Sequence, residues 1–289
     1  TNTLSYDFKK FFKNNKNHLN LLAGQEYIVT RERELRNVVH GFPTEYTADD
    51  CINYSTKGNP YEVTNYGYPD DVLFSFFGRA NYDFDSKYLF SATFRADGSS
   101  KFAKGNRWGF FPAGALAWRI SNEDFLKDNQ VVSNLKLRLS YGSSGNDRID
   151  ADLYQKLYGV SSSRPAGWGE VSHYYYNFYN SKYVYNPDVK WETTITRNIG
   201  IDFGFFKERL SGTIDVYWNT VKDLLVPSDI PGYTGYTKLM TNVGQTSNRG
   251  IELQLNAWLI ETKDFSLNAT FNIGCLLYTS PSPRDPKTS

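Results

Sequence analysis

The sequence predicts an all-β protein whose long antiparallel strands form part of a transmembrane barrel. Apolar and polar residues alternate over segments of about ten residues or more, which is near the length of a tilted strand that crosses a bilayer. Short polar turns alternate with longer connections, as the short periplasmic turns and long extracellular loops of outer-membrane barrels do. A soluble β-sandwich shares the alternation, so strand length and loop asymmetry are the features that favour the barrel.

The clearest strand pair lies in residues 191–219. In its first arm, Ile199 and its apolar neighbours two residues apart share one face, while Asp202 falls on the other. A polar turn at 206–209 leads into a second arm with the same alternation, in which Asp215 is on the polar face. Because successive strand side chains point to opposite faces, we expect one face of this pair toward lipid and the other toward the barrel lumen.

The rest of the chain repeats this unit. Further strands are expected at 1–6, 18–29, 72–84, 88–96, 108–120, 134–141, 251–259 and 265–273. Gly and Pro residues within 108–120 predict a bulge or bend in that strand. The charged segment 31–39 predicts a short helix, and 121–132 predicts one helical turn behind a capping serine. The long connections are expected at 30–71, 142–190 and 222–247.

Composition narrows the class of protein. The mean hydropathy is −0.54, and no apolar run reaches the roughly 18 residues of a spanning helix, which excludes a helical membrane protein. A barrel is not excluded by this measure, since its lumen-facing half is polar. A net charge of +1 over 289 residues leaves no basic surface for nucleic acid. The aromatic share of 17% suits barrel walls with interfacial girdles, and also sugar-binding clefts.

The sequence offers no pattern for catalysis, a metal ion or a cofactor. His18, His40 and His173 lie far apart, and Cys51 and Cys275 are too few for a disulfide framework. The glycine patterns of a nucleophile elbow, a Walker loop or a dinucleotide site do not occur. We therefore expect a protein that binds and passes a cargo and is not an enzyme.

The ionisable residues of the predicted strands are expected on the polar faces. A charge that faces lipid at the bilayer centre costs about 2–4 kcal/mol, so this placement fits a lumen-facing surface. The side chains expected to face the lumen are Arg79, Arg95, Arg138, Asp202, Asp215 and Glu252.

Aromatic residues gather in the connection at 161–185. Aromatic faces with a polar tip suit stacking on sugars or packing against peptides and partner surfaces, and packing within the loop is the alternative. The candidate ligand-binding residues are Trp168, Tyr174, Tyr175, Tyr176 and Tyr179.

Three blocks interrupt or border the strands with motifs of their own. They read FRADGSSKFAKGNRWGFFPAGALAWRISNEDF at 94–125, LKLRLSYGSSGND at 135–147, and YTGYTKLMTNVGQTSNRGIEL at 233–253. In content and order they resemble the conserved blocks of SusC/RagA-type TonB-dependent receptors, and the resemblance covers nearly all of 1–274. As physical features, Gly98 is expected to take the positive φ of a tight turn, and 248–250 to begin a strand.

The resemblance implies a function for the whole protein. It implies an outer-membrane barrel of roughly 22 strands, of which this chain supplies about nine or ten from the C-terminal part. Such receptors import oligosaccharides or peptides, draw energy through TonB by an N-terminal region outside this chain, and carry a SusD-like surface lipoprotein as a lid. No cofactor is implied. A passive porin-like channel and a soluble carbohydrate-binding β-sandwich module are the alternatives.

The sequence features at both ends predict that this chain is a section of a longer protein. No signal peptide opens the sequence, and residues 1–6 look like the end of a strand already under way. The segment CLLYTSPSPRD at 275–285 breaks the alternation and resembles translated sequencing-adapter sequence, with a Pro/Ser-rich surface tail as the alternative. We therefore expect the partial barrel domain over 1–274 and a non-native tail over 275–289.

Overall fold

The chain forms two compact units in a computed structural model. The structure describes residues 1–8, 16–67, 70–126, 129–150, 153–155, 159–161, 175–177, 183–231, 236–262 and 264–279. One unit comprises Thr1–Tyr27 and Leu73–Ser289, and the other comprises Ile28–Val72. Across the described ranges, none of the helices combines the length and the apolar character needed to span a membrane.

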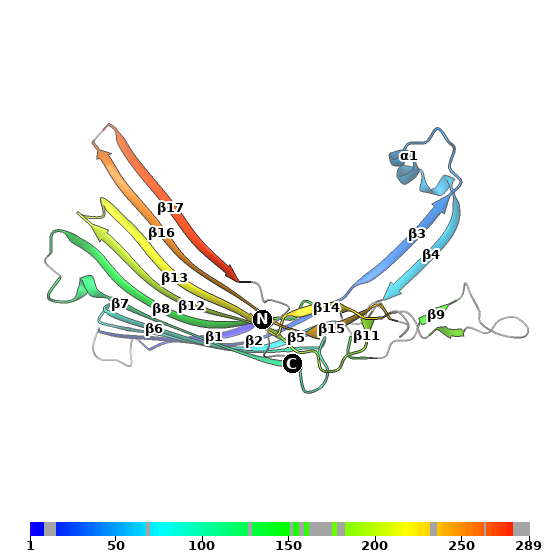
Figure 1. The fold of residues 1–289 in the computed structure, drawn as a ribbon, viewed down its shortest axis with the longest axis horizontal. Coiled ribbons are helices and arrows are strands. Elements are labelled where there is room, and N and C mark those ends of the chain that lie inside the picture. The colour runs from blue at the N-terminus through cyan, green and yellow to red at the C-terminus, as the bar shows by residue number, and fades with distance from the viewer. Residues whose placement is uncertain are drawn as a thin grey trace, which may run out of the picture. The chain divides into compact units, whose positions relative to one another are not determined.

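A single ten-stranded sheet is the main element of the first unit (Figure 1). Its strands follow one another in the order of the chain, so the sheet is a meander of hairpins, and apart from β1 each has 12 to 17 residues. In order they are β1 (Asn2–Asp7), β2 (Asn17–Thr30), β5 (Asp71–Phe84), β6 (Tyr88–Ser99), β7 (Trp108–Arg119), β8 (Val132–Asn146), β12 (Glu192–Phe205), β13 (Leu210–Lys222), β16 (Gln245–Glu261) and β17 (Ser266–Thr279). This confirms the predicted all-β fold with partial-barrel topology.

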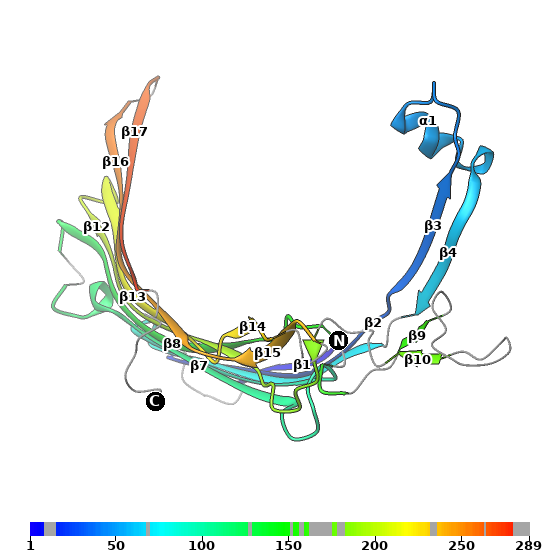
Figure 2. The ribbon, with the colours of Figure 1, turned by 45° about the vertical axis from the view of Figure 1, so that its right-hand side comes forward.

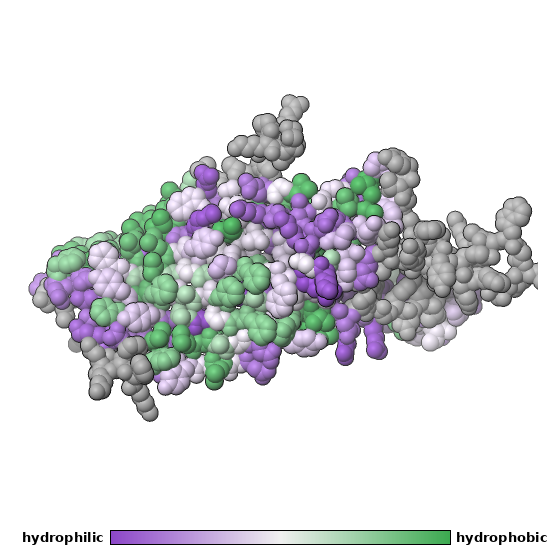
Figure 3. All heavy atoms as spheres, turned by 90° about the horizontal axis from the view of Figure 1, so that it is seen from below, coloured by the Kyte–Doolittle hydropathy of each residue, from purple (hydrophilic) through white to green (hydrophobic). Residues whose placement is uncertain are grey.

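The sheet is curved (Figure 2). Its two faces differ in chemistry, since apolar side chains gather on one of them. Seen from below, hydrophobic side chains are spread over the middle of the sheet (Figure 3). By register, the apolar face of the sheet carries Phe90, Phe110, Leu116, Ile199 and Ile251, which are between 40% and 63% exposed. An apolar face this exposed is expected where lipid covers it. The period-2 alternation thus has the predicted consequence, an apolar face and a polar one.

Two arginines depart from the expected separation of charge. Arg197 lies two residues from Ile199 in β12, and Arg249 lies two residues from Ile251 in β16, so both belong to the apolar face. Both side chains are exposed. The expectation that strand charges keep to the polar face is therefore wrong at these two positions.

The shortest turns, 85–87, 206–209 and 262–265, lie at one end of the strands, and the longest connections, 31–70, 147–191 and 223–244, lie at the other. The connection 120–131 departs from this asymmetry, because it lies at the short-turn end and is longer than 100–107 at the opposite end.

In two of the short turns, non-glycine residues take left-handed backbone conformations: Asp85 and Ser86 between β5 and β6, and 206–208 between β12 and β13. A hydrogen bond within the first turn, and one between Ser133 of β8 and the second turn, hold these conformations. The backbone N–H of Ser86 donates to Asp83 Oδ1 at 2.8 Å, and that of Lys207 donates to the hydroxyl of Ser133 at 2.6 Å. Polar side chains thus compensate for the absence of glycine.

Of the bulge or bend expected in the strand at 108–120, a bulge is not observed. Strand β7 pairs with β6 from Gly98↔Trp108 to Tyr88↔Trp118 with no register shift. The ladder between β7 and β8 runs from Ala113 to Arg119. Pro112 lies just outside this ladder, so it does not have to donate a backbone hydrogen bond to β8. A missing N–H is tolerated at such a position. The register shifts lie elsewhere, at Gly204/Phe205 and in β16.

Strand β17 continues beyond the predicted break at Cys275. Its pairing with β16 runs on from Ile251↔Cys275 to Ser247↔Thr279, because β16 extends to Gln245 and supplies partners for these residues. Residues 280–289 lie outside the described ranges. The domain boundary at 274 and the non-native origin of the tail stay predictions.

The second unit corrects the expectation of a helix at 31–39. Residues Arg33–His40 form strand β3, which pairs antiparallel with β4 (Asn59–Gly67). The β-branched pair Val38 and Val39 disfavours a helix, and β4 provides a ladder for the backbone groups of this segment. The helix of this unit is instead α1 (Ala48–Asn53), which Thr47 and Asp50 begin with a capping box. The short 3₁₀ helix η2 follows at Ser55–Lys57.

Smaller elements occur in the remaining connections of the first unit. The 3₁₀ helix η3 (Ile120–Asn122) confirms a helical turn after β7, although it begins one residue early. Strands β9 (Gly159–Ser161) and β10 (Tyr175–Asn177) pair antiparallel. A three-stranded sheet joins β11 (Tyr183–Val184), β15 (Lys238–Asn242) and β14 (Leu225–Asp229).

Candidate lumen surface and its supports

An arginine with two carboxylates occupies the centre of the polar face. Gly200 of β12 is the register partner of both Arg138 and Asp215, and its missing side chain leaves room for them. Arg138 Nε donates to Asp202 Oδ1 at 2.9 Å, and Nη2 donates to both Asp215 oxygens at 3.1 Å. Lys136 Nζ lies 3.7 Å from the second Asp202 oxygen. The sequence predicts these residues on one face, and the structure joins them into one network.

A second network is built around Arg95. Its Nε donates to both oxygens of Asp97, at 2.7 and 2.9 Å, and its Nη2 donates to Glu26 at 3.1 Å and to the buried hydroxyl of Ser75 at 3.0 Å. Three strands, β2, β5 and β6, thus meet at one guanidinium. Arg95 and Asp97 are two residues apart on one strand, so their pairing follows from the alternation. Glu26 and Ser75 come from other strands, and the sequence does not reveal their role.

The remaining predicted lumen residues lie on the same polar face. Arg79 Nε donates to Thr93 Oγ1, its register partner, at 3.2 Å. Glu252 is the register partner of Asp215 and accepts a hydrogen bond from Tyr217. The charged groups of this face are bonded to one another. That the face lines a lumen stays a prediction.

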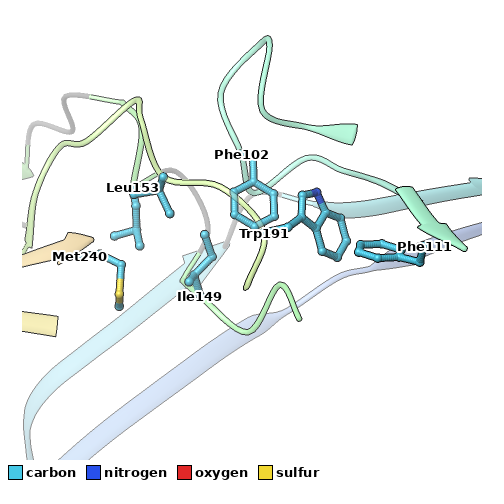
Figure 4. Packing of buried hydrophobic residues seen from close by; sticks show 7 residues of the cluster. Phe102, Phe111, Ile149, Leu153, Trp191 and Met240 are labelled. Atoms are coloured by element: carbon cyan, nitrogen blue, oxygen red, sulfur yellow. The ribbon is translucent and has the colours of Figure 1, made fainter. Parts of the chain in front are cut away.

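The first and third sequence blocks meet in an apolar core at the long-connection end of the sheet (Figure 4), and the second block borders this core through Gly145. Trp191 stands between the rings of Phe102 and Phe111, with ring centroids 5.2 and 5.5 Å apart, and its Nε1 donates to the carbonyl of Arg107 at 2.9 Å. Met240 of the third block completes the cluster. We call this cluster the loop-end core; its members are Phe102, Phe111, Ile149, Leu153, Val189, Trp191 and Met240.

Glycines and polar pairs close this core. A Cβ at Gly109 or Gly145 would overlap the ring of Phe111, so these block glycines are required by packing. Ser99 Oγ donates to Asp147 at 2.9 Å and links the first block to the second. Glu192 accepts from Asn146 at 3.0 Å and from the backbone N–H of Leu225 at 2.9 Å.

Two expectations for the blocks are wrong. Gly98 does not take a positive φ; it lies within β6, where its missing side chain leaves space for the ring of Trp108. Residues 248–250 do not begin a strand, because β16 starts at Gln245. At Gly250 the space that a side chain would fill is taken by the Tyr217 hydroxyl. Both glycines serve close packing across strands.

A polar cluster occupies the opposite end of the sheet. Glu123 Oε1 accepts from the Tyr88 hydroxyl at 2.7 Å and from Trp118 Nε1 at 3.0 Å, while Oε2 lies 3.1 Å from Lys87 Nζ. We call Glu123 and these three partners the turn-end cluster. Donation by Tyr88, then by Trp118 and Lys87, lowers the pKa of the Glu123 carboxyl from 4.5 to about 2. Donation to Glu123 in turn raises the pKa of Lys87. Sequence reasoning missed this cluster, although Trp118 and Glu123 stand in the first block.

The predicted ligand-binding aromatics are placed only in part. Tyr175 and Tyr176 belong to strand β10, opposite Ser161 and Val160 of β9. Trp168, Tyr174 and Tyr179 lie outside the described residues. Within the described part of the chain, no three His, Cys, Asp or Glu side chains are grouped to hold a metal ion.

Comparison with known proteins identifies the family. The family described as "TonB dependent receptor-like, beta-barrel" matches residues 1–287. TonB-dependent receptor SusC of Bacteroides thetaiotaomicron is 44% identical over 206 residues, which are 70% of this chain and 20% of that protein. TonB-dependent receptor P3 of Formosa agariphila is 34% identical over 274 residues, 94% of this chain and 26% of that protein.

A solved structure supports the same family assignment. That of the RagAB peptide importer in its "closed-closed" state is similar with a TM-score of 0.79 and 26% identity, over 96% of this chain and 29% of that chain. The chain thus spans about a fifth to a quarter of the length of the curated relatives. The ten-stranded meander is a section of an outer-membrane wall, and the chain belongs to the β-barrel family of TonB-dependent receptors, in the SusC/RagA type.

Proposed function

We propose that this chain forms a section of the barrel wall of an outer-membrane importer, which takes up oligosaccharides or peptides with energy transmitted through TonB. The observation that carries the proposal is the ten-stranded meander, with its exposed apolar face and internally bonded polar face, in a chain of this family. The proposal assigns binding and passage of cargo to the protein, and no catalysis. A SusD-like lipoprotein is the proposed partner, in keeping with the similarity to SusC and to the RagAB importer.

The charge networks support a structural role for this part of the wall. The carboxylates around Arg138 and Arg95 are between 11% and 24% exposed, and each already accepts hydrogen bonds from an arginine. Groups bonded in this way have little capacity left for a cargo. We therefore propose that cargo recognition lies in the connections at the long-connection end, where the aromatic candidates stand, and that the loop-end core anchors these connections.

The alternatives differ from this proposal in testable ways. A soluble sandwich needs a second sheet over the apolar face, whereas the ten strands form one sheet whose apolar face is exposed. This arrangement, together with the match of residues 1–287 to a TonB-dependent receptor β-barrel family, favours the barrel over the sandwich. A passive channel would have the same barrel wall, but its transport would not require energy from TonB.

The decisive experiment measures energised uptake. A full-length receptor that contains this wall section is expressed in the outer membrane, and entry of labelled oligosaccharides and of labelled oligopeptides is followed separately. We expect one of the two classes to enter, and entry to stop when TonB is deleted or the inner-membrane proton gradient is collapsed. Entry that persists under both treatments would establish the passive channel instead.

The partner is tested on the same strain. Affinity purification of the receptor in mild detergent is expected to recover a surface lipoprotein in about equal amount, and its deletion is expected to lower cargo affinity. Recovery of the receptor alone, with unchanged uptake after the lipoprotein gene is deleted, would remove the partner from the proposal.

A further inference from the structure

Four register partners form a distinct row on the apolar face. Tyr141 of β8, Arg197 of β12, Trp218 of β13 and Arg249 of β16 stand side by side on neighbouring strands. The guanidinium of Arg197 lies 6.0 Å from the ring centroid of Tyr141. Arg197, Trp218 and Arg249, together with Thr220 and Ser247, line a shallow hollow in the sheet. We call the two arginines with Tyr141 and Trp218 the outer arginine row.

The row marks a change of chemistry in β8, β13 and β16, whereas in β12 the next position toward the long connection is the apolar Ile195. Toward the short turns, its neighbours on the same face are apolar, as at Ile199, Val216 and Ile251. Toward the long connections, the next positions in β13 and β16 are Thr220 and Ser247. A boundary between apolar and polar side chains at one level of a barrel wall indicates the edge of the membrane. Tyr and Trp are the residues that such edges favour.

The depth of the row agrees with that position. Arg197 lies eight residues from Phe205, the end of β12 at the short turns, or roughly 26 Å along the strand. At a strand tilt near 40°, this corresponds to about 20 Å along the bilayer normal, close to the height of about 25 Å of an apolar band. The row is therefore at the long-connection edge of the lipid-facing band.

The two arginines also differ from those of the polar face in their partners. Arg95 and Arg138 are each bonded to two carboxylates, whereas neither Arg197 nor Arg249 has a salt bridge or side-chain hydrogen bond among the described residues. One strand lies between them, so their backbones are roughly 10 Å apart, within reach of one anionic group between two long side chains. Planar guanidinium groups bind phosphate through paired hydrogen bonds.

We propose that the outer arginine row is a binding site for the phosphate of a phosphorylated lipid in the outer leaflet. Arg197 and Arg249 hold the phosphate from two sides, Trp218 and Tyr141 stack against the upper part of the acyl region, and Thr220 and Ser247 face the head group. The site rests on the apolar face being in lipid, and it does not depend on which cargo is imported.

The test compares lipid bound to the full-length receptor and to matched variants. Receptor is purified from outer membranes in mild detergent, and phosphorylated lipid retained per receptor is counted by native mass spectrometry. The double variant Arg197→Gln/Arg249→Gln is expected to retain at least about tenfold less, because it loses several charge-assisted hydrogen bonds. Arg197→Lys/Arg249→Lys is expected to retain more than the glutamine variant.

Arg79→Gln removes one positive charge from the polar face, so it is the control matched to the single variants Arg197→Gln and Arg249→Gln, which are measured beside the double variant. Arg79→Gln is expected to retain lipid as the parent receptor does. Each glutamine variant is first checked for folding by its heat-dependent gel mobility. If the double variant does not fold, the two single variants replace it in the comparison, each with a smaller expected loss. Equal retention by parent and folded variants would overturn the proposal.

A second arm separates lipid from free phosphate. Receptor in nanodiscs of neutral lipid is titrated with inorganic phosphate, and then with a phosphorylated lipid, while Trp fluorescence is recorded. Quenching is expected with the lipid alone and is expected to be absent from a Trp218→Phe variant. A response to millimolar inorganic phosphate of the same size would overturn the assignment to lipid. Failure of energised uptake with lipid retention intact would overturn the transport proposal and leave this site standing.

Discussion

The two ends of the wall are fastened by different interactions. At the long-connection end, the loop-end core buries Phe102 and Trp191 to 1% and 8% exposure, and one tryptophan hydrogen bond orients the cluster. At the short-turn end, the turn-end cluster gathers three donors on one carboxylate, and its ion-pair side chains are 16% and 15% exposed. Apolar burial stabilises more per residue than a partly exposed ion pair does. We therefore expect the loop-end core to contribute more to the stability of the folded wall than the turn-end cluster does.

The largest expected effect is at Trp191. Trp191→Ala should lower the free energy of unfolding of the full-length receptor in detergent by about 3–5 kcal/mol, since it leaves a cavity in the loop-end core. The urea midpoint of unfolding measures this. Trp191→Phe keeps most of the ring but loses the hydrogen bond to Arg107, so it should cost less. The Trp258 side chain is 41% exposed, so Trp258→Ala is the control. If Trp191→Ala lowers the free energy of unfolding by no more than Trp258→Ala does, the loop-end core is not the stronger stabilising region.

Overpacking the same core should have the next largest effect. Gly145→Ala places a methyl group into the ring of Phe111 and should cost about 1–3 kcal/mol. The control is Gly114→Ala, where the nearest atom to the new Cβ is the Ser91 carbonyl oxygen at 3.7 Å. Equal urea midpoints for the two variants would show that the ring moves aside freely and that the core is loosely packed.

The wall between the two ends is tested at Arg138. Arg138→Gln leaves Asp202 and Asp215 close together without a counter-charge, and because these groups are partly exposed we expect a loss of about 1–2 kcal/mol. Adding Asp202→Asn should restore part of it. A double-mutant cycle measures the coupling, and additive losses would mean that the network is only apparent in the static structure.

The smallest effect is expected at the turn-end cluster and is visible through pH. Hydrogen bonds from Tyr88, Trp118 and Lys87 lower the pKa of Glu123 to about 2 from 4.5. A depressed pKa stabilises the folded state above pH 4.5, and this contribution is lost as the pH falls from about 4.5 toward 2. The thermal midpoint of the parent minus that of Glu123→Gln should shrink over this range. A difference independent of pH would assign the effect of Glu123 to something other than its charge.

Local patterns predicted most of the wall. The hairpins, the polar position of Arg138 and Asp202, and the helical turn after β7 follow from alternation and capping, which act between residues close in sequence. The same reasoning failed at 31–39, where β4 supplied a pairing partner that the charged segment itself does not reveal. It also failed at Gly98, whose role is space for a ring on the next strand.

The sequence alone determined the all-β class, the approximate strands, the family and the division into an apolar and a polar face. Each of these depends on the period of two or on contiguous motifs. The tertiary structure decided which residues meet across strands. The sharing of Glu26 and Ser75 by Arg95, the loop-end core around Trp191, the turn-end cluster and the outer arginine row all depend on register, and register is set by the whole sheet rather than by any single strand.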